Sequence, residues 1–212
     1  MLLWLTLLWV GCDTVSIVDK PITWNQEREK LSLDYMKVRH GIEASEAKID
    51  PKIIVVHWTV IPTMEKSFEV FDRVKLPSSR TGIKNASSLN VSAHFLVDRD
   101  GTIYQLLPET TFARHVIGLN YCSIGIENVA DGDSLPLTES QFEANKKLID
   151  HLFKKHDIEY LIGHDQYKQF IGHPLWKETD PNYLTEKSDV GSEFISRLHE
   201  SIKKELKKAP AL

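Results

Sequence analysis

Cysteine is scarce in this sequence, which has 2 Cys and 9 His among its 212 residues. Two cysteines cannot form a Cys-rich zinc module or a disulfide scaffold, so a metal site would have to be built from His and carboxylate ligands. An excess of basic residues is also missing, because 26 Lys and Arg stand against 30 Asp and Glu. We therefore expect no nucleic-acid partner. The composition, 42% hydrophobic and 26% charged, is that of a globular domain rather than a disordered chain.

A single apolar run opens the chain, and it is too short to span a bilayer, which takes about 20 residues. Nine of the first ten residues are apolar, and the first charged residue is Asp13. This length suits the core of a signal peptide. The run ends at Gly11 and Cys12, which resembles a bacterial lipoprotein processing site. We expect residues 1–12 to be a signal and the protein to be exported to the cell envelope, periplasmic or membrane-anchored through a lipid on Cys12. An ordinary secretion signal or a misassigned start are the alternatives.

The remaining pattern predicts an α/β fold with a mixed central β-sheet flanked by helices. Residues 13–50 read as a polar N-terminal extension with a short helix near 26–35, and residues 51–207 as a single domain. Short β-branched or alternating runs predict strands at 53–56, 91–97, 102–107, 123–129 and 160–162. Residues 138–153 and 194–206 have helical spacing, and Thr138 with Gln141 forms a capping-box pattern. Residues 166–189 lack periodicity and are expected to be irregular.

Two histidines stand directly after predicted buried strands. His57 follows the run at 53–56, and His164 follows a second apolar run and Gly163. Each alone is as readily a hydrogen-bonded structural His, but two at equivalent strand ends are what a mononuclear zinc site assembled by folding needs. A third ligand would then be a carboxylate, because Cys122 lies in a predicted strand of its own.

Four ordered segments make the assignment more specific: residues 57–59 (HWT), 91–101 (VSAHFLVDRDG), 123–127 (SIGIE) and 163–165 (GHD). Together they resemble the type-2 zinc N-acetylmuramoyl-L-alanine amidases, relatives of the peptidoglycan recognition proteins. The resemblance implies a mixed sheet with Zn²⁺ at the floor of a groove. It also implies hydrolysis of the amide between the lactyl group of N-acetylmuramic acid and the L-alanine of peptidoglycan stem peptides.

The family's third zinc ligand is an Asp in a Lys-x-Asp-Pro-Gly stretch, and this chain offers two candidates. Lys177 lies three residues before Asp180, which Pro181 follows without a Gly. Lys187 lies two before Asp189, and Gly191 lies two after it, with Val190 in place of the Pro. The spacing of Lys187 and Gly191 around it favours Asp189. This choice requires an insertion after His164, but lengthening a loop adds only a small entropic cost to folding.

Two further residues carry the catalytic roles that the resemblance implies. Glu127 matches the family's general base, which accepts a proton from the attacking water, and Lys187 would stabilise the oxyanion. A Glu paired with a basic residue at the strand end is the structural alternative. If Asp180 were the ligand, Lys177 would take the place of Lys187.

Three aromatic residues are candidates for substrate binding. His94 and His115 match positions near the family's groove, and each is equally well read as a satisfied structural His. Trp58 offers a surface for a sugar ring, although core packing is the default for Trp.

Other functions fit the same residues. A non-catalytic peptidoglycan-binding module would lack a working third ligand or its Lys. A zinc amidase acting on soluble (anhydro)muropeptides would keep all of them. His57 and His164 could also be structural, with no metal. We predict the zinc amidase, with peptidoglycan or muropeptides as its partner.

Overall fold

The computed structural model describes residues 15–211, except 79, 81–82 and 84–85. Cys12 and the apolar run that we predict to be a signal lie outside the described residues. The strands are β1 (Ile17–Asp19), β2 (Ile53–Trp58), β3 (Phe95–Val97), β4 (Ile103–Gln105), β5 (Ser123–Asn128) and β6 (Tyr160–Gly163). The helices are α1 (Gln26–His40), α2 (Met64–Asp72), α4 (Glu139–Lys155) and α5 (Ser192–Ser201), with 3-10 helices η1 (Asn120–Cys122) and η2 (His164–Phe170). Among the described residues, no helix combines the length and hydropathy needed to cross a membrane.

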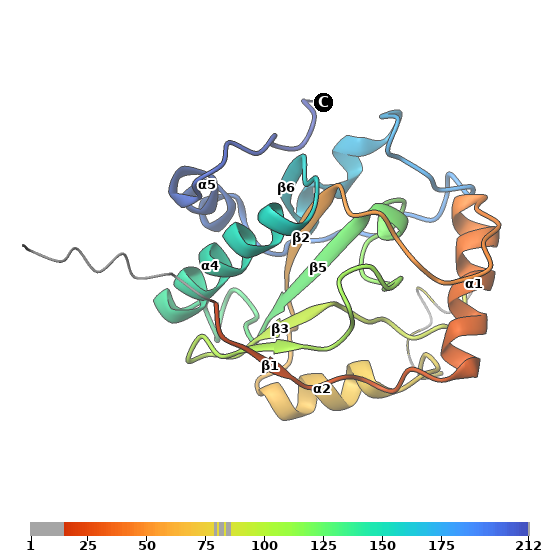
Figure 1. The fold of residues 1–212 in the computed structure, drawn as a ribbon, viewed down its shortest axis with the longest axis horizontal. Coiled ribbons are helices and arrows are strands. Elements are labelled where there is room, and N and C mark those ends of the chain that lie inside the picture. The colour runs from red at the N-terminus through yellow and green to blue at the C-terminus, as the bar shows by residue number, and fades with distance from the viewer. Residues whose placement is uncertain (1–14, 79, 81–82, 84–85, 212) are drawn as a thin grey trace, which may run out of the picture.

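The strands form one mixed sheet in the order β1-β4-β3-β5-β2-β6 (Figure 1). All neighbouring strands are parallel except β3 and β4, which pair antiparallel through the turn that contains Gly101. Gly101 has a φ of 88°, a conformation that glycine adopts without a steric penalty. The prediction of a mixed sheet with a hairpin at this turn is confirmed.

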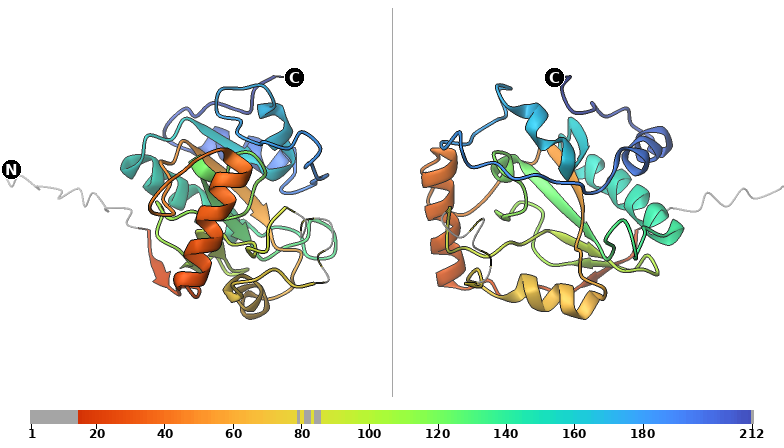
Figure 2. Two further views of the ribbon diagram at one scale, coloured as in Figure 1. Left: turned by 90° about the vertical axis from the view of Figure 1, so that its right-hand side faces the viewer. Right: turned by 180° about the vertical axis from the view of Figure 1, so that it is seen from behind.

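One face of the sheet is covered by α4 and α5 (Figures 1 and 2). Ile54 and Val56 of β2 contribute to a core cluster with Leu148 of α4 and Leu198 of α5. Helix α4 begins at Thr138 with the predicted capping box, in which side chain and backbone of residues 138 and 141 bond reciprocally. This face is therefore mainly apolar, and its buried polar side chains Gln141 and Asn145 are hydrogen-bonded within the protein.

The opposite face carries the alternate residues of the same strands. Ile53 and Val55 pack here against Tyr167 and Phe170 of η2, as the two-residue period of a strand requires. Helix α2 covers the sheet near β3, and α1 stands at one side of the molecule (Figure 1).

The N-terminal segment is integrated into this structure. Strand β1 adds an edge strand beside β4, and the Nη2 of Arg28 donates to the carbonyl oxygens of Phe71 and Asp72 at 3.0 and 2.9 Å. Tyr35 of α1 packs against Phe112, with ring centroids 5.7 Å apart. The extension predicted at 13–50 thus supplies both an edge strand and a side wall.

Several elements differ from their predictions. Strand β1 and helix α2 are not predicted, and only the last three residues of the run at 91–97 form a strand. In the first part of that run, the backbone N–H of Ser92 donates instead to Arg114 O, and that of His94 to Gly125 O. These bonds hold residues 91–94 in an extended but irregular segment before β3. The helix predicted at 194–206 ends at Ser201, and η2 extends into the stretch predicted to be irregular.

Candidate metal centre and catalytic cleft

Strands β2 and β5 bring His57 and Glu127 side by side. The two residues are direct partners in the register of this parallel pair. Because Ile54 and Val56 face the α4 and α5 layer, alternation places His57 on the opposite face, and the same holds for Glu127 beyond Ile126. Both side chains are buried, His57 at 1% and Glu127 at 9% relative exposure.

His164 and Asp189 reach the same place from the C-terminal half. His164 begins η2 directly after β6, and Asp189 lies between the long insertion and α5. The backbone N–H of Asp165 donates to Asp189 O at 2.6 Å, which holds the two segments together. The Asp189–Val190 peptide bond is cis.

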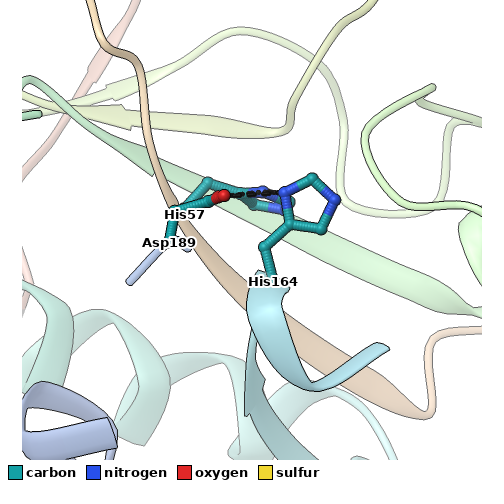
Figure 3. A group of neighbouring side chains, drawn as sticks. All are labelled: His57, His164 and Asp189. Carbon is teal, nitrogen blue, oxygen red and sulfur yellow. Dashed lines mark hydrogen bonds and ion pairs between the residues drawn. The ribbon is translucent and has the colours of Figure 1, made fainter. Parts of the chain in front are cut away.

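The side chains of His57, His164 and Asp189 point toward one another (Figure 3). His57 Nδ1 and His164 Nδ1 lie 2.9 Å apart, and Asp189 Oδ2 lies 2.9 Å from His164 Nδ1 and 3.3 Å from His57 Nδ1. Ligands at zinc-bond lengths of about 2.0–2.2 Å in a tetrahedral site are about 3.3 Å apart. Two imidazole nitrogens and one carboxylate oxygen therefore fit a zinc ion and leave its fourth position open, as catalytic sites require.

The protonation of these groups suits metal binding. Burial lowers the pKa of His164 to about 3, with His57 acting in the same direction. Burial opposes ionisation of Asp189, but the contacts of its carboxyl with His164 and His57 outweigh it and lower the pKa of the carboxyl well below its usual range. His164 is thus a neutral imidazole, and Asp189 is a carboxylate at neutral pH.

A chain of hydrogen bonds fixes the tautomer of His57. His115 Nε2 lies 3.2 Å from the carbonyl oxygen of Ser123, which can only accept, so this nitrogen carries the proton. His115 Nδ1 then accepts from His57 Nε2, 3.0 Å away, and the lone pair of His57 is left on Nδ1, facing the metal position. Gly125 makes room for the ring, since a Cβ there would lie 2.8 Å from His115. His115 therefore orients a metal ligand.

His115→Ala is expected to lower zinc affinity about 10- to 100-fold, as loss of such an orienting partner does elsewhere. Competition titration with a chelator measures this without an activity assay. His151→Ala, on α4 and far from the group, is the matched control and should bind zinc as the wild type does. Unchanged affinity in His115→Ala would refute the orienting role.

Glu127 and Lys187 line the cleft that opens beside the three ligands. This cleft has a volume of about 150 Å³ and is also lined by Trp58 and His115. Burial raises the pKa of Glu127 to about 7, although the nearby charges of His57 and Lys187 act to lower it. The Oε2 of Glu127 is buried without a hydrogen-bond partner, so this carboxylate is poised to take a proton from a bound molecule.

The alternative ligand pair lies elsewhere. Asp180 Oδ2 is 3.7 Å from Arg39 Nη1, and its side chain is 46% exposed. The ammonium of Lys177 lies over the ring of Tyr121, 4.8 Å from its centroid. Of the two candidates, the structure brings only Asp189 to His57 and His164.

The two remaining substrate-binding candidates, His94 and Trp58, differ in whether they reach the cleft. His94 is fully buried, its Nε2 donates to Thr111 O at 2.8 Å and its Nδ1 accepts from the Gly125 N–H at 3.0 Å. No ring nitrogen of His94 is left for a substrate, so His94 has a structural role, and the prediction that it binds substrate is wrong. Trp58 does line the cleft, with its ring packed on Gly132, where a Cβ would lie 2.1 Å away.

Val60 is a cleft residue that the sequence did not point to. It lines the cleft, is 69% exposed and has a φ of 55°, which is rare for a β-branched residue. Its N–H donates to Ala130 O, and the N–H of Thr59 donates to Asn128 O, both at 2.9 Å. These bonds hold the strained backbone in place.

Val60→Gly is therefore expected to raise the free energy of unfolding by about 1 kcal/mol, because glycine relieves the strain at positive φ. Thermal unfolding should show a Tm about 2–4 °C higher. Val38→Gly is the matched control: Val38 is also exposed, at 59%, but lies within α1, where glycine should lower stability. A fall in Tm for both variants would contradict the strain at Val60.

Comparison with known proteins places these features in context. The sequence profile of the family described as N-acetylmuramoyl-L-alanine amidase matches residues 47–183. No curated protein matches the chain. The structure of N-acetylmuramoyl-L-alanine amidase LysC from Clostridium intestinale URNW is similar, with a TM-score of 0.52 at 20% identity over 90% of this chain and 100% of that one. The human protein PGRP-IBETAC, solved with glycosamyl muramyl pentapeptide, gives 0.51 at 15% identity over 76% and 88%. At such identities the structures establish a shared fold.

Proposed function

Because this chain belongs to the N-acetylmuramoyl-L-alanine amidase family, whose profile covers residues 47–183, we propose that it is a zinc-dependent amide hydrolase of peptidoglycan. The bond cleaved joins the lactyl group of N-acetylmuramic acid to the L-alanine of the stem peptide. The observation that carries the proposal is the convergence of His57, His164 and Asp189 within 4.8 Å of one another, beside the buried carboxyl of Glu127. A purely structural pair of histidines would not require a third, anionic partner or an open cleft.

Each residue of the cleft has a defined task. His57, His164 and Asp189 would hold Zn²⁺, which supplies Lewis acidity toward the amide carbonyl and the attacking water. Glu127 accepts one proton from the water as the water oxygen bonds to the carbonyl carbon. Lys187 balances the negative charge that develops on the carbonyl oxygen. Glu127 then delivers the proton to the amide nitrogen as the C–N bond breaks, leaving a carboxylic acid and a free amine.

The products define the test. Zinc-loaded protein incubated with cell-wall material should release stem peptides whose new amino terminus is alanine, with no increase in reducing sugar ends. Parallel reactions with intact sacculi and with soluble muropeptides decide which form of substrate is preferred. If no alanine amine appears from either substrate while zinc is bound, the chain is a binding module and the hydrolase is refuted.

We further propose that the protein is exported and carries a lipid on Cys12, which the apolar run before Cys12 supports. Metabolic labelling with a radioactive fatty acid in a bacterial host should label the wild type and not Cys12→Ser. Cys122→Ser, which removes the buried second cysteine, should be labelled normally. Label that persists in Cys12→Ser would exclude this anchor.

A further inference from the structure

A second, smaller cavity adjoins the catalytic cleft. It shares Val91, His115, His164 and Lys187 with the cleft and has a volume of about 50 Å³, against about 150 Å³ for the cleft itself. We name it the side pocket, and its further lining includes Tyr35, Ile117, Asn120, Tyr183 and Thr185. Tyr35 and Thr185 both lie outside the stretch matched by the family profile.

Asn120 presents a buried donor to the side pocket. Its Oδ1 accepts from the backbone N–H groups of His115 and Val116, both at 2.8 Å, which fixes the orientation of the amide. The Nδ2 is left buried without a hydrogen-bond partner, and the residue is 0% exposed. Buried polar groups in proteins are satisfied with few exceptions, so this amide group is available to a bound molecule.

Thr185 supplies a second such atom from the insertion. Its backbone is held by Tyr167, whose hydroxyl accepts from the Thr185 N–H at 2.8 Å and donates to the Thr185 O at 2.7 Å. The Oγ1 of Thr185 is also buried without a partner. A hydroxyl both donates and accepts, so Asn120 and Thr185 together complement the C=O and N–H of a peptide group.

Apart from Lys187, which the side pocket shares with the cleft, the remaining lining residues that the structure describes offer no unengaged charged group. Val91 and Ile117 are apolar, and the one guanidinium in the lining, Arg114, is already engaged. Its Nη1 donates to the carbonyl oxygens of Leu89 and of Ser87, the latter at 3.2 Å, and its Nη2 donates to Tyr183 Oη at 3.1 Å. The pocket therefore suits a neutral amide flanked by a short apolar side chain.

We propose that the side pocket binds the peptide side of the substrate, with Asn120 and Thr185 recognising the peptide group that follows the first residue after the scissile bond. The proposal rests on the amidase function above. The wider cleft, lined by Trp58, has the room that a sugar ring needs, so the acyl side lies there and the stem peptide enters the side pocket.

The test uses matched variants and two substrates. Thr185→Val removes the hydroxyl at nearly constant volume, and Thr185→Ser keeps it. Asn120→Asp keeps the Oδ1 that binds the backbone of His115 and Val116 but replaces the free donor. With zinc-loaded protein and N-acetylmuramoyl-L-alanyl-D-isoglutamine, Thr185→Val should raise KM about 3- to 10-fold with kcat little changed, the effect of one lost hydrogen bond in substrate binding. Thr185→Ser should stay within about twofold of the wild type.

The shorter substrate N-acetylmuramoyl-L-alanine lacks the second peptide group, so Thr185→Val should leave its KM unchanged. Equal effects of Thr185→Val on both substrates, or none on either, would overturn the proposal and leave the two polar atoms to an internal water. Calorimetric binding of the dipeptide L-alanyl-D-isoglutamine separates the two hypotheses. If the wild type binds the dipeptide and Thr185→Val binds it more weakly, the peptide-binding role of the side pocket is supported even if the protein does not hydrolyse the substrate. If the wild type hydrolyses the substrate but the dipeptide does not bind, the pocket assignment fails and the amidase stands.

Discussion

Glu127→Gln is expected to lower kcat for amide hydrolysis about 10²- to 10⁴-fold, the contribution of a positioned general base, while zinc binding is retained. Gln keeps the shape of the side chain and its place beside His57 in the β2–β5 register, but it cannot accept the water's proton. The measurement is steady-state release of alanine amines with zinc content determined on the same sample. Activity within threefold of the wild type in a zinc-loaded Glu127→Gln protein would remove Glu127 from the mechanism.

The same substitution is expected to stabilise the metal-free protein. Burial raises the pKa of Glu127 to about 7, above its ordinary value of 4.5, so the folded state holds the proton more tightly than the unfolded state does. The stabilisation from this group is complete below about pH 4.5 and is lost as the pH rises through about 7. At pH 8, Glu127→Gln removes a buried, unpartnered charge, so its Tm should exceed that of the wild type.

Glu109→Gln is a matched control of opposite sign. Glu109 is also buried, at 7% exposure, but it contacts Lys155 and His156, each at 2.6 Å. Burial acts to raise its pKa, yet the hydrogen bonds from these partners lower it overall. Its charge therefore stabilises the fold at neutral pH. Glu109→Gln should lower the Tm and leave kcat unchanged. Glu127→Gln should instead raise the Tm and lower kcat.

Asp189→Ala is expected to abolish zinc binding at concentrations that saturate the wild type, and with it hydrolysis. Two imidazoles without the carboxylate lose both a ligand and the only negative charge of the group, so affinity should fall by more than the roughly 10- to 100-fold of an orienting residue. Thermal unfolding gives a readout independent of activity. Zinc at 1,000 times the Kd adds about 4 kcal/mol to the stability of the wild type and should add nothing to Asp189→Ala.

Asp180→Ala distinguishes the ligand from its neighbour in sequence. Asp180 belongs to the surface around Arg39, so its loss should leave zinc content and the zinc-dependent rise in Tm intact. Loss of zinc from Asp180→Ala together with retention in Asp189→Ala would reverse the assignment. Loss from neither variant would mean that zinc is held elsewhere in the chain.

The sequence predicted those parts of the site that depend on strand ends and spacing. His57, Glu127 and His164 follow short apolar runs, and such runs fix which residue comes to the edge of a parallel sheet. Asp189 could be ranked above Asp180 by its distance from Lys187. The predictions failed for elements whose formation depends on partners that are distant in sequence. Strand β1 has three residues and forms because β4 lies beside it, and its two β-branched residues are too short a run to predict a strand.

Other features left a signal that can be recognised afterwards. Thr63 caps α2 by accepting from the Lys66 N–H, and Thr before a helix is a common start signal. By contrast, the free amide of Asn120 and the hydroxyl of Thr185 could not be foreseen. Each atom is free because its own residue is bonded through other atoms, and that pattern appears only once the insertion has folded over the sheet.

The pairing of His57 with Glu127 on neighbouring rungs ties chemistry to strand alignment. A slip of β2 against β5 by one position would turn His57 into the apolar layer beneath α4 and bring Val56 beside the cleft. Occupancy of the metal position therefore depends on the register of β2, because His57 meets His164 and Asp189 only when its side chain faces the cleft. Zinc thus stabilises only the chain in which β2 is correctly aligned in the sheet.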